Sequence, residues 1–365
     1  MKKKKTEIMK KFSILKFCLI ISLAIFITSC SSDNNGEENE TVGSNTIKVG
    51  PFSGAVSDSK AVIVYKLLVP SQNCRVEYSK NSSFNDSEFS DIYTASEANA
   101  NYVKITLNNL EPETKYFYQL ELNGEKLEQS KGEFQTFSDG AKSFKFAFGN
   151  SLKSESDRSG LRASIDEDIL FFLNTGDIHY DNNNTPDIDL FRNSYQKALQ
   201  RNDMKYMGKR TPFVFVWDDH DYGDNNSDKT APGRLQSGQA YRESIPHYPL
   251  ITSENNGAIY QAFTVNDTRI VLTDLRSMRD PNSQTDNEDK TMMGEEQLTW
   301  FKNEIRESSS EYSLVIWVSS VPYTAENRQD SWAGFSYERQ VIANYIKEQD
   351  INNLMIISGD AHSIS

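Results

Sequence analysis

Three short apolar runs in this chain each end in carboxylate and imidazole side chains. The sequence reads FFLNTGDIHY over residues 171–180, FVFVWDDHDYGDN over 213–225 and LMIISGDAH over 354–362. Buried charges are tolerated only when they are paired or bound to a metal, and carboxylate oxygens and imidazole nitrogens are common metal ligands. The chain has four histidines, and three of them lie in these runs. The pattern therefore predicts a metal site assembled at the ends of buried strands.

The composition limits the partners of such a site. The chain has 365 residues and a formal net charge of −13, and this length leaves room for more than one domain. An acidic surface repels polyanions, which argues against nucleic acid as a stable partner. An anionic small molecule would need a local cationic centre, and bound metal ions can supply one.

The N-terminus has the layout of an export signal. Lysines crowd the first 16 positions, an apolar stretch runs over 18–27, and small residues precede Cys30. The apolar stretch is too short for a comfortable membrane span. The segment resembles a bacterial lipobox, which implies a lipoprotein signal peptide over 1–29, lipid attachment at Cys30 and a flexible tether over 30–45. We therefore expect an exported protein, lipid-anchored to the cell envelope at the outer membrane, on the periplasmic or surface face; the alternative is an uncleaved anchor helix.

Residues 46–138 alternate between apolar and polar side chains, with polar turns at short spacing. This pattern is typical of a β-sandwich. Residues 110–118 read LEPETKYFY, which resembles the corner motif of fibronectin type III domains, where a tyrosine hydroxyl ties the start of a strand to the preceding loop. We interpret this domain as a spacer or scaffold, with ligand binding as the alternative.

From residue 143 to residue 365 the pattern changes to strands that alternate with helices. Short, nearly continuous apolar runs predict strands that are covered on both faces. These runs are 144–148, 169–173, 213–217, 270–273, 314–318 and 354–357. Apolar stripes predict helices over 295–306 and 337–347. The expected fold class is mixed α/β, an N-terminal β-sandwich followed by layered sheets flanked by helices, with the site beyond the carboxyl ends of the strands.

The segment after the second of the opening three runs carries the strongest signal. Four ionisable residues, DDHD at 218–221, directly follow Phe-Val-Phe-Val-Trp, and a cation would relieve their mutual repulsion. The alternative is a helix cap or a solvated acidic turn. Asp360 and His362 lie two residues apart, so in an extended segment both side chains can face the same side.

Taken in order, these motifs resemble those of the alkaline phosphatase D family, which is similar in turn to the purple acid phosphatases. The motifs are G-D-x-x-Y at 176–180, W-D-D-H-D-x-G-x-N at 217–225, D-x-R-x-x-R at 274–279 and G-D-x-H at 359–362. The resemblance covers roughly residues 45–365, including the fibronectin-like domain. It implies a calcineurin-like metallophosphoesterase domain over 143–365 that hydrolyses phosphate mono- or diesters. The implied cofactors are divalent or trivalent metal ions, iron with calcium, manganese or zinc, in a di- or multinuclear centre.

The resemblance also assigns roles to individual residues. The implied metal ligands are Asp177, Tyr180, Asp219, Asp360 and His362, and Ser151 stands at a further ligand position. Asp177 is expected to bridge two ions, Tyr180 to ligate the ferric-type ion, and His220 to hydrogen-bond the phosphoryl oxygen or protonate the leaving group. Five further motif residues are expected behind the ligands, as extra calcium ligands or at the substrate: Asp218, Asp221, Asn225, Arg276 and Arg279.

Two features depart from the family pattern. Family members place a cysteine or an aspartate after the first strand, where this sequence has Ser151, and a neutral hydroxyl is a poorer ligand than a thiolate. The chain also stops three residues after His362, whereas family members continue with further strands. We expect Ser151 to affect metal occupancy and activity, and one interpretation of the short C-terminus is a truncated domain.

The expected nucleophile is metal-activated water, because no serine lies in a G-x-S-x-G elbow and no Ser-His-Asp set is evident. Either Arg276 or Arg279 is expected to clamp a phosphate oxygen, with strand-end salt bridges as the alternative. We expect His179 to lie behind the ligands. His247 is expected in an ordinary loop, with the substrate mouth as the alternative.

The sequence therefore predicts a monomeric, metal-dependent phosphoric ester hydrolase that acts on a small phosphate ester and is held at a membrane through lipidated Cys30. The alternative is a lipid-anchored surface binding protein with a degenerate phosphatase domain. A phosphodiesterase that acts on phospholipids shares the motifs and differs only in the shape of its pocket.

Overall fold

The computed structural model of this chain describes residues 46–152, 159–252, 257–325 and 328–361. The predicted signal peptide, tether and lipidation site at Cys30 lie outside these residues, as does the predicted ligand His362. Within the described ranges, no helix combines the length and the apolar character needed to cross a bilayer.

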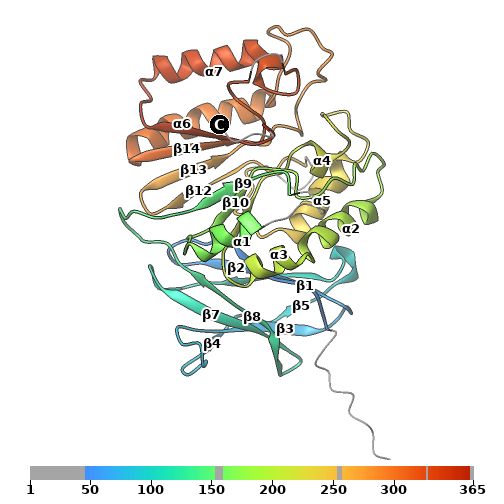
Figure 1. The fold of residues 1–365 in the computed structure, drawn as a ribbon, viewed down its shortest axis with the longest axis vertical. Coiled ribbons are helices and arrows are strands. Elements are labelled where there is room, and N and C mark those ends of the chain that lie inside the picture. Colours follow the sequence, from blue (N-terminus) through green and yellow to red (C-terminus); the bar gives the residue numbers. More distant parts are fainter. Residues whose placement is uncertain (1–45, 153–158, 253–256, 326–327, 362–365) are drawn as a thin grey trace, which may run out of the picture. The chain divides into compact units, whose positions relative to one another are not determined.

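The N-terminal part is a sandwich of two antiparallel sheets, coloured blue to cyan in Figure 1. One sheet has the order β1-β2-β6 and the other has the order β4-β3-β7-β8, with β5 paired to β3. The elements are β1 (Ile47–Gly54), β2 (Ala61–Leu67), β3 (Asn73–Ser79), β4 (Glu88–Phe89), β5 (Tyr93–Thr94), a 3₁₀ turn η1 (Glu97–Asn99), β6 (Tyr102–Leu107), β7 (Lys115–Leu122) and β8 (Glu125–Gln135). The predicted β-sandwich is confirmed.

The corner of the sandwich has the hydrogen bond that the sequence motif predicted. The hydroxyl of Tyr116 accepts the backbone N–H of Glu111 at 2.9 Å. The ring is buried and stacks on Phe134, with 5.7 Å between the ring centroids. The hydroxyl therefore ties the start of β7 to the loop before it.

The rest of the described chain contains two further sheets with helices around them (Figure 1). A parallel sheet has the order β11-β10-β9, and a mixed sheet has the order β12-β13-β14-β15, in which only β12 is antiparallel to its neighbour. The strands are β9 (Ala147–Gly149), β10 (Phe172–Asn174), β11 (Phe213–Phe215), β12 (Gln261–Val265), β13 (Thr268–Leu272), β14 (Leu314–Ser319) and β15 (Leu354–Ser358). The helices are α1 (Ser159–Asp166), α2 (Ile188–Leu199), α3 (Asn202–Gly208), α4 (Asp219–Tyr222), α5 (Arg234–Ser244), α6 (Gly294–Glu311), a 3₁₀ turn η3 (Trp332–Phe335) and α7 (Ser336–Glu348). The predicted mixed α/β fold is confirmed.

Helices α6 and α7 pack on the sheet that contains β14, and they include both predicted helical stretches. Phe301 and Ile305 of α6 and Ile342 of α7 are buried together with Trp317 of β14 in one apolar cluster. A second apolar cluster runs without interruption from the sandwich through β10 and β11 to β13. The sandwich and the α/β part therefore share a core, which supports the interpretation of the sandwich as a scaffold.

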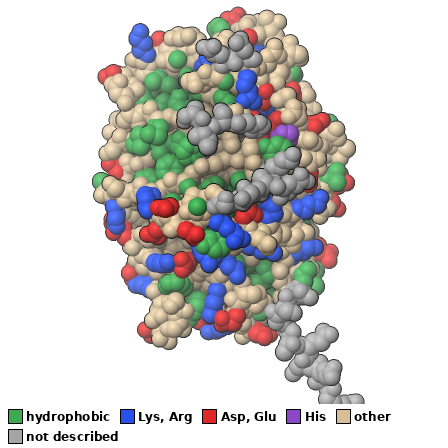
Figure 2. All heavy atoms as spheres, viewed as in Figure 1, with side chains coloured by type: hydrophobic (Ala, Val, Ile, Leu, Met, Phe, Trp, Pro, Cys, Tyr) green, Lys and Arg blue, Asp and Glu red, His purple; other side chains and the backbone are tan. Residues whose placement is uncertain are grey.

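The strands β9 and β15 are more exposed than their apolar sequences indicated. In the run 144–148 only the last two residues join the ladder, although the ring of Phe146 stacks on Phe171 with centroids 5.0 Å apart. Each of the two strands has a single neighbour among the described strands, and Phe148 and Met355 are 53% and 49% exposed. Coverage on both faces is therefore wrong for these two strands. Figure 2 shows apolar side chains gathered on the part of the viewed face where the two sheets lie.

Candidate metal centre

Three loops at the carboxyl ends of strands supply the predicted ligands. Asp177 follows β10, Asp218 and Asp219 follow β11, and Asp360 follows β15. Because β10 and β11 are neighbouring parallel strands, their carboxyl ends meet at the same edge of the sheet. The strand β15 belongs to the other sheet, where it runs parallel to β14. The site therefore lies where the carboxyl ends of the two sheets converge.

Two sets of candidate ligand atoms have Asp177 in common. Asp177, Asp219 and His220 each offer one ligand atom, and these atoms lie within 4.8 Å of one another; we name them the first triad. The second triad, with the same spacing, is Asp177, Asp218 and Asp360. A carboxylate that belongs to both triads is placed to bridge two cations, as in dinuclear hydrolytic sites.

Carboxylate oxygens in the two triads are buried without a partner. In the described part of the chain, Oδ1 of Asp177 and Oδ2 of Asp218 have no hydrogen-bond partner. Burial, together with the neighbouring carboxylates Asp218, Asp221 and Asp219, raises the pKa of Asp177 to about 10, and burial raises the pKa of Asp360 to about 6. A bound cation would satisfy these oxygens and remove the repulsion. The residues present therefore fit the metal ions that the sequence resemblance implies.

The backbone of the ligand loops restricts which residues they can contain. Gly176 has a φ of +119°, and a Cβ at this position would lie 2.4 Å from the Cβ of Asp218. The close approach of the two loops therefore requires glycine. Asp177, Asp360 and Ser151 have φ values of +59°, +53° and +53°. Residues other than glycine are seldom held in this left-handed region, and those that are tend to cluster at functional sites.

Asp221 supports the Asp177 loop instead of joining either triad formed by the described residues. Its Oδ2 accepts the backbone N–H groups of Asp177 at 2.7 Å and Asp218 at 3.1 Å, and its Oδ1 accepts the N–H of Ile178 at 2.9 Å. Burial raises the pKa of Asp221 to about 7, although these hydrogen bonds lower it. The bond from the Asp218 N–H is the helix-cap contact that the alternative expected, and Asp218 and Asp219 of the same segment are also candidate metal ligands.

Arg276 and Arg279 are buried behind the site. Both side chains are 0% exposed. Nε of Arg276 donates to Oδ1 of Asp218 at 2.6 Å, and its Nη2 donates to Asp330 at 2.9 Å; Nη2 of Arg279 donates to Asp330 at 2.8 Å. Burial raises the pKa of Asp330, but the two guanidinium groups outweigh it and hold the value at about 2. The predicted phosphate clamp is therefore wrong for both arginines, and the alternative of salt bridges is confirmed.

The ring of His220 is held by neighbours from the loop after β10. Its Nδ1–H donates to Oδ1 of Asn182 at 2.5 Å, and the ring packs on Tyr180 with 4.2 Å between centroids. The Tyr180 hydroxyl in turn donates to Oδ2 of Asp177 at 3.0 Å. These contacts place both predicted residues, Tyr180 and His220, at the first triad.

The other two histidines that the structure describes lie outside the ligand shell. His179 is buried, its ring meets Tyr195 edge to face at 5.4 Å, and burial lowers its pKa to about 4. His247 stacks on Tyr241, and its Nδ1–H donates to the carbonyl oxygen of Tyr248 at 2.8 Å. His179 therefore lies behind the ligands, and His247 is an ordinary loop residue.

The structure places the predicted site residues Ser151 and Asn225 differently relative to the ligand loops. The backbone N–H of Ser151 donates to the carbonyl oxygen of Gly176 at 3.0 Å, and its hydroxyl is buried, so the residue lies beside the ligand loop. The side chain of Asn225 is exposed. The group that contacts Oδ2 of Asp219 is the N–H of Asn226, at 2.6 Å, because the chain turns at this residue with a φ of +59°. The backbone of Asn226, and not the side chain of Asn225, therefore contacts Asp219, and a role for Asn225 stays a prediction.

Sequence reasoning missed three residues that contact the site: Asn182, Ser320 and Arg328. The hydroxyl of Ser320 donates to Oδ1 of Asp218 at 2.9 Å, and Nη2 of Arg328 donates to Oδ2 of Asp360 at 2.7 Å. Asn182 could have been found, because it lies only two residues after the G-D-x-x-Y segment. Ser320 and Arg328 lie in a stretch without a motif, and only the fold brings them to the ligands.

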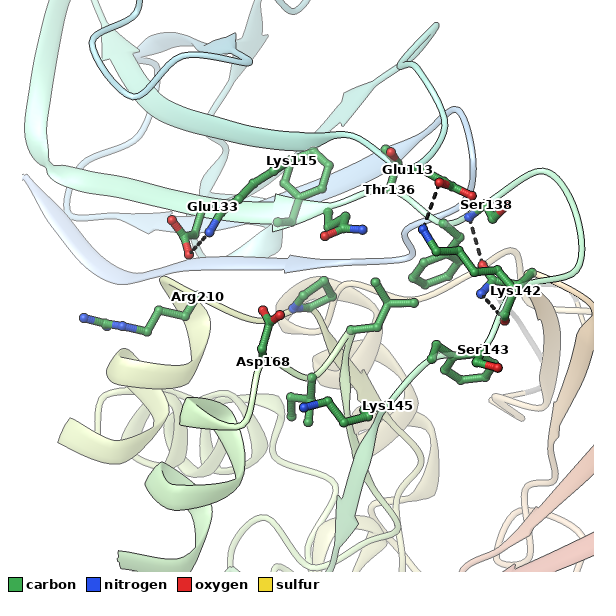
Figure 3. Close-up of a pocket in the computed structure, with 18 residues that line it drawn as sticks. Glu113, Lys115, Glu133, Thr136, Ser138, Lys142, Ser143, Lys145, Asp168 and Arg210 are labelled. Atoms are coloured by element: carbon green, nitrogen blue, oxygen red, sulfur yellow. Dashed lines mark hydrogen bonds and ion pairs between the residues drawn. The ribbon is translucent and has the colours of Figure 1, made fainter.

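A separate cavity of about 350 Å³ lies between the sandwich and the segments that lead into the parallel sheet (Figure 3). Four of its charged residues form two ion pairs: Lys115 with Glu133 at 2.8 Å and Lys142 with Glu113 at 2.9 Å. Lys145 lines it just before β9, so the cavity is at the amino ends of the strands, opposite the triads. No triad residue lines it, so we interpret this cavity as a crevice within the scaffold.

Comparison with protein families and curated proteins gives a consistent result. Residues 167–365 match the family model described as "PhoD-like phosphatase", and residues 31–138 match "PhoD-like phosphatase, N-terminal domain". Alkaline phosphatase D from Bacillus subtilis (strain 168) is 27% identical over 203 residues, a match that covers 47% of this chain and 35% of that protein. The matched region thus spans about a third of the length of this curated relative.

Two solved structures share the fold. The structure of PhoD has a TM-score of 0.78 at 21% identity, covering 87% of this chain and 72% of that one. Purple acid phosphatase PPD1 from yellow lupin (Lupinus luteus) seeds has a TM-score of 0.60 at 10% identity, covering 87% of this chain and 58% of that one. At these identities the likeness shows the fold, a metallophosphoesterase-like α/β part joined to an N-terminal sandwich.

Proposed function

Because the chain belongs to the PhoD-like phosphatase family, we propose that it is a metal-dependent hydrolase of phosphoric esters. The observation that carries the proposal is the place of Asp177 in both triads. A carboxylate that two cations can share suits a two-metal hydrolytic site, in which the ions lie about 3.5–4 Å apart. Asp219 and His220 complete the first triad, and Asp218 and Asp360 complete the second.

The four aspartates of the two triads would hold the ions, with Tyr180 and His362 extending the set as the resemblance implies. When bound, the ions would supply Lewis-acid activation of water and of the phosphoryl group. Iron with calcium, manganese or zinc is the proposed composition. The neutral hydroxyl of Ser151 is a weak ligand in place of the cysteine or aspartate of relatives, so we expect lower affinity for one ion.

The role of His220 follows from its hydrogen bond to Asn182. Because Nδ1–H donates to an amide oxygen at 2.5 Å, the proton that His220 exchanges with the leaving oxygen is the one at Nε2. General acid catalysis of this kind contributes about 10²–10⁴-fold. Asp221 keeps the Asp177 loop in place by accepting the backbone N–H groups of Asp177, Ile178 and His179.

The experiment that tests the proposal measures metal content and hydrolysis together. The purified chain should hydrolyse a chromogenic phosphate monoester or diester, and a chelator should abolish the activity. Asp177→Asn should lose both ions, whereas Asp219→Asn and Asp360→Asn should each lose one. Asp224→Asn is the matched control, because Asp224 is exposed in the same segment as Asp219. Activity that survives the chelator would contradict the proposal, and a wild-type chain without metal would favour the alternative of a degenerate domain that binds a surface ligand.

We place this activity at the cell envelope, on a small phosphate ester, in a monomer anchored by lipid at Cys30. The sequence Ile27-Thr28-Ser29-Cys30 supports this placement. Labelling with a fatty-acid probe should mark the wild-type chain, and Cys30→Ser should abolish the label and release the protein into the soluble fraction. Labelling that persists in Cys30→Ser would contradict the anchor.

A further inference from the structure

An anionic substrate meets few accessible cations at this site. Four aspartates of the two triads lie close together, and the two arginines of the D-x-R-x-x-R motif, Arg276 and Arg279, are fully buried. The side chain of Arg328, in contrast, is 41% exposed while it contacts a triad residue. Its Nη2 donates to Oδ2 of Asp360 at 2.7 Å, and its Nη1 donates to the carbonyl oxygen of Asp360 at 3.0 Å. The Arg328 side chain is therefore partly exposed and contacts a candidate ligand, which places it at the edge of the ligand cluster.

The turn that carries Arg328 is fixed to the site at a second point. Two residues further along the chain, Asp330 is paired with Arg276 and Arg279 at 2.9 and 2.8 Å. The hydroxyl of Ser331 donates to the carbonyl oxygen of Arg328 at 2.7 Å, which closes the turn. Arg276 in turn contacts Asp218 of the second triad. The position of Arg328 relative to both ligands is therefore set by ion pairs.

We propose that Arg328 binds the phosphate group of the substrate and thereby favours phosphate monoesters over diesters, an inference that rests on the proposed function. A guanidinium group has five N–H donors in a planar fork. Two of the donors of Arg328 contact Asp360, and among the described residues no acceptor contacts the other three. This leaves donors for a phosphate oxygen while the contact with Asp360 is kept.

The preference for monoesters follows from charge and from the number of acceptors. A phosphate monoester has three oxygens without an ester group and two negative charges, whereas a diester has two such oxygens and one charge. A permanently charged fork that binds phosphate in a bidentate manner therefore stabilises the monoester more. Lysine keeps the charge but not the fork.

The test measures binding of inorganic phosphate to the metal-loaded chain by calorimetry, independently of turnover. Arg328→Ala should raise the Kd for phosphate about tenfold, the loss of one charge-assisted hydrogen bond, and Arg328→Lys should raise it less.

In turnover, Arg328→Ala should lower kcat/KM for a monoester about tenfold more than kcat/KM for a diester. Arg339→Ala is the matched control, because Arg339 donates to the carbonyl oxygen of Tyr323 at 3.2 Å in the loop before Arg328 but contacts neither triad.

The outcomes separate this inference from the proposed function. A wild-type chain that hydrolyses no phosphate ester contradicts the proposed function, whereas equal phosphate Kd values for wild type and Arg328→Ala overturn the role of Arg328 whether or not the chain is active. Loss of phosphate affinity together with loss of metal also overturns it, because Arg328 would then only orient Asp360. Equal losses for monoester and diester overturn the preference. Retained metal, weaker phosphate binding and a lower monoester-to-diester ratio support the inference.

Discussion

The carboxylate of Asp221 holds the loop of Asp177 from behind, with its Oδ2 accepting the Asp177 backbone N–H at 2.7 Å. The two residues are far apart in the sequence, yet the acid of the second motif supports the backbone of the first. Asp221 is fully buried and also accepts the N–H of Ile178 at 2.9 Å. A residue that belongs to neither triad therefore determines where the shared candidate ligand lies.

Asp221→Asn should weaken metal binding without removing a ligand. An amide presents its own N–H groups to the loop, so at least one backbone donor loses its acceptor and the Asp177 loop shifts. Loss of such an outer contact lowers metal affinity by about 10–100-fold. Competition with a chromogenic chelator measures the affinity, and Asp224→Asn, an exposed neighbour, should bind metal like the wild type. Unchanged affinity in Asp221→Asn would show that the loop needs no cap.

The convergence of the site could be predicted from the sequence, because each motif follows an apolar run and parallel strands end at a common edge. Asp177, Asp218, Asp219 and Asp360 lie together for that reason. The sequence does not show which of the neighbouring carboxylates belongs to a triad. The direction of each side chain depends on the local turn of the backbone, and Asp221 contacts the Asp177 loop instead. A sequence pattern does not fix such a turn.

The environment of the charged side chains could not be predicted. Arg276 and Arg279 stand in a motif that could serve substrate or structure, and their burial is decided by Asp330, which lies in a loop without any motif. Arg328 was missed for the same reason. The prediction that both faces of β9 are covered was wrong. The exposure of Phe148 depends on which elements lie next to β9, and an apolar run in the sequence does not identify them.

Asn182→Ala should slow catalysis while metal and substrate binding are kept. The Asn182 side chain contacts the His220 ring at 2.5 Å and neither triad includes it, so its loss should lower kcat by about 10–100-fold, within the range that general acid–base catalysis contributes, and leave KM nearly unchanged. Asn182→Asp should restore part of the rate, because a carboxylate also accepts the Nδ1–H. Asn183→Ala is the control, since Asn183 donates to the hydroxyl of Ser194 at 3.1 Å instead. A parallel fall in metal content would refute a role confined to His220.

Tyr116→Phe should destabilise the sandwich without changing catalysis. The variant leaves the N–H of Glu111 without the acceptor that lies 2.9 Å away, at a cost of about 1–2 kcal/mol in the free energy of unfolding. Urea unfolding measures the change, and kcat/KM at low temperature should stay at the wild-type value. Tyr93→Phe is the matched control: the half-exposed Tyr93 hydroxyl accepts the N–H of Thr106 at 3.2 Å, and water can replace it. An equal loss in both variants would argue against a special role of the corner.

His247 should make the fold sensitive to acid in a defined pH range. Burial lowers its pKa from 6.5 to about 3, and Lys104 adds to the effect. Between these two values the unfolded chain binds a proton that the folded chain does not, so the contribution of His247 to stability falls as the pH falls from 6.5 towards 3. The slope is at most about 1.4 kcal/mol per pH unit for one group. His247→Gln keeps a donor for the Tyr248 carbonyl but does not titrate. The free energy of unfolding of the variant minus that of the wild type should therefore increase as the pH is lowered, by at most that slope. The difference at pH 7.5 is the reference. Unfolding curves recorded with chelator throughout exclude metal loss as the cause, and a difference that stays constant from pH 7.5 to pH 4.5 would mean that the folded protein accommodates a charged His247.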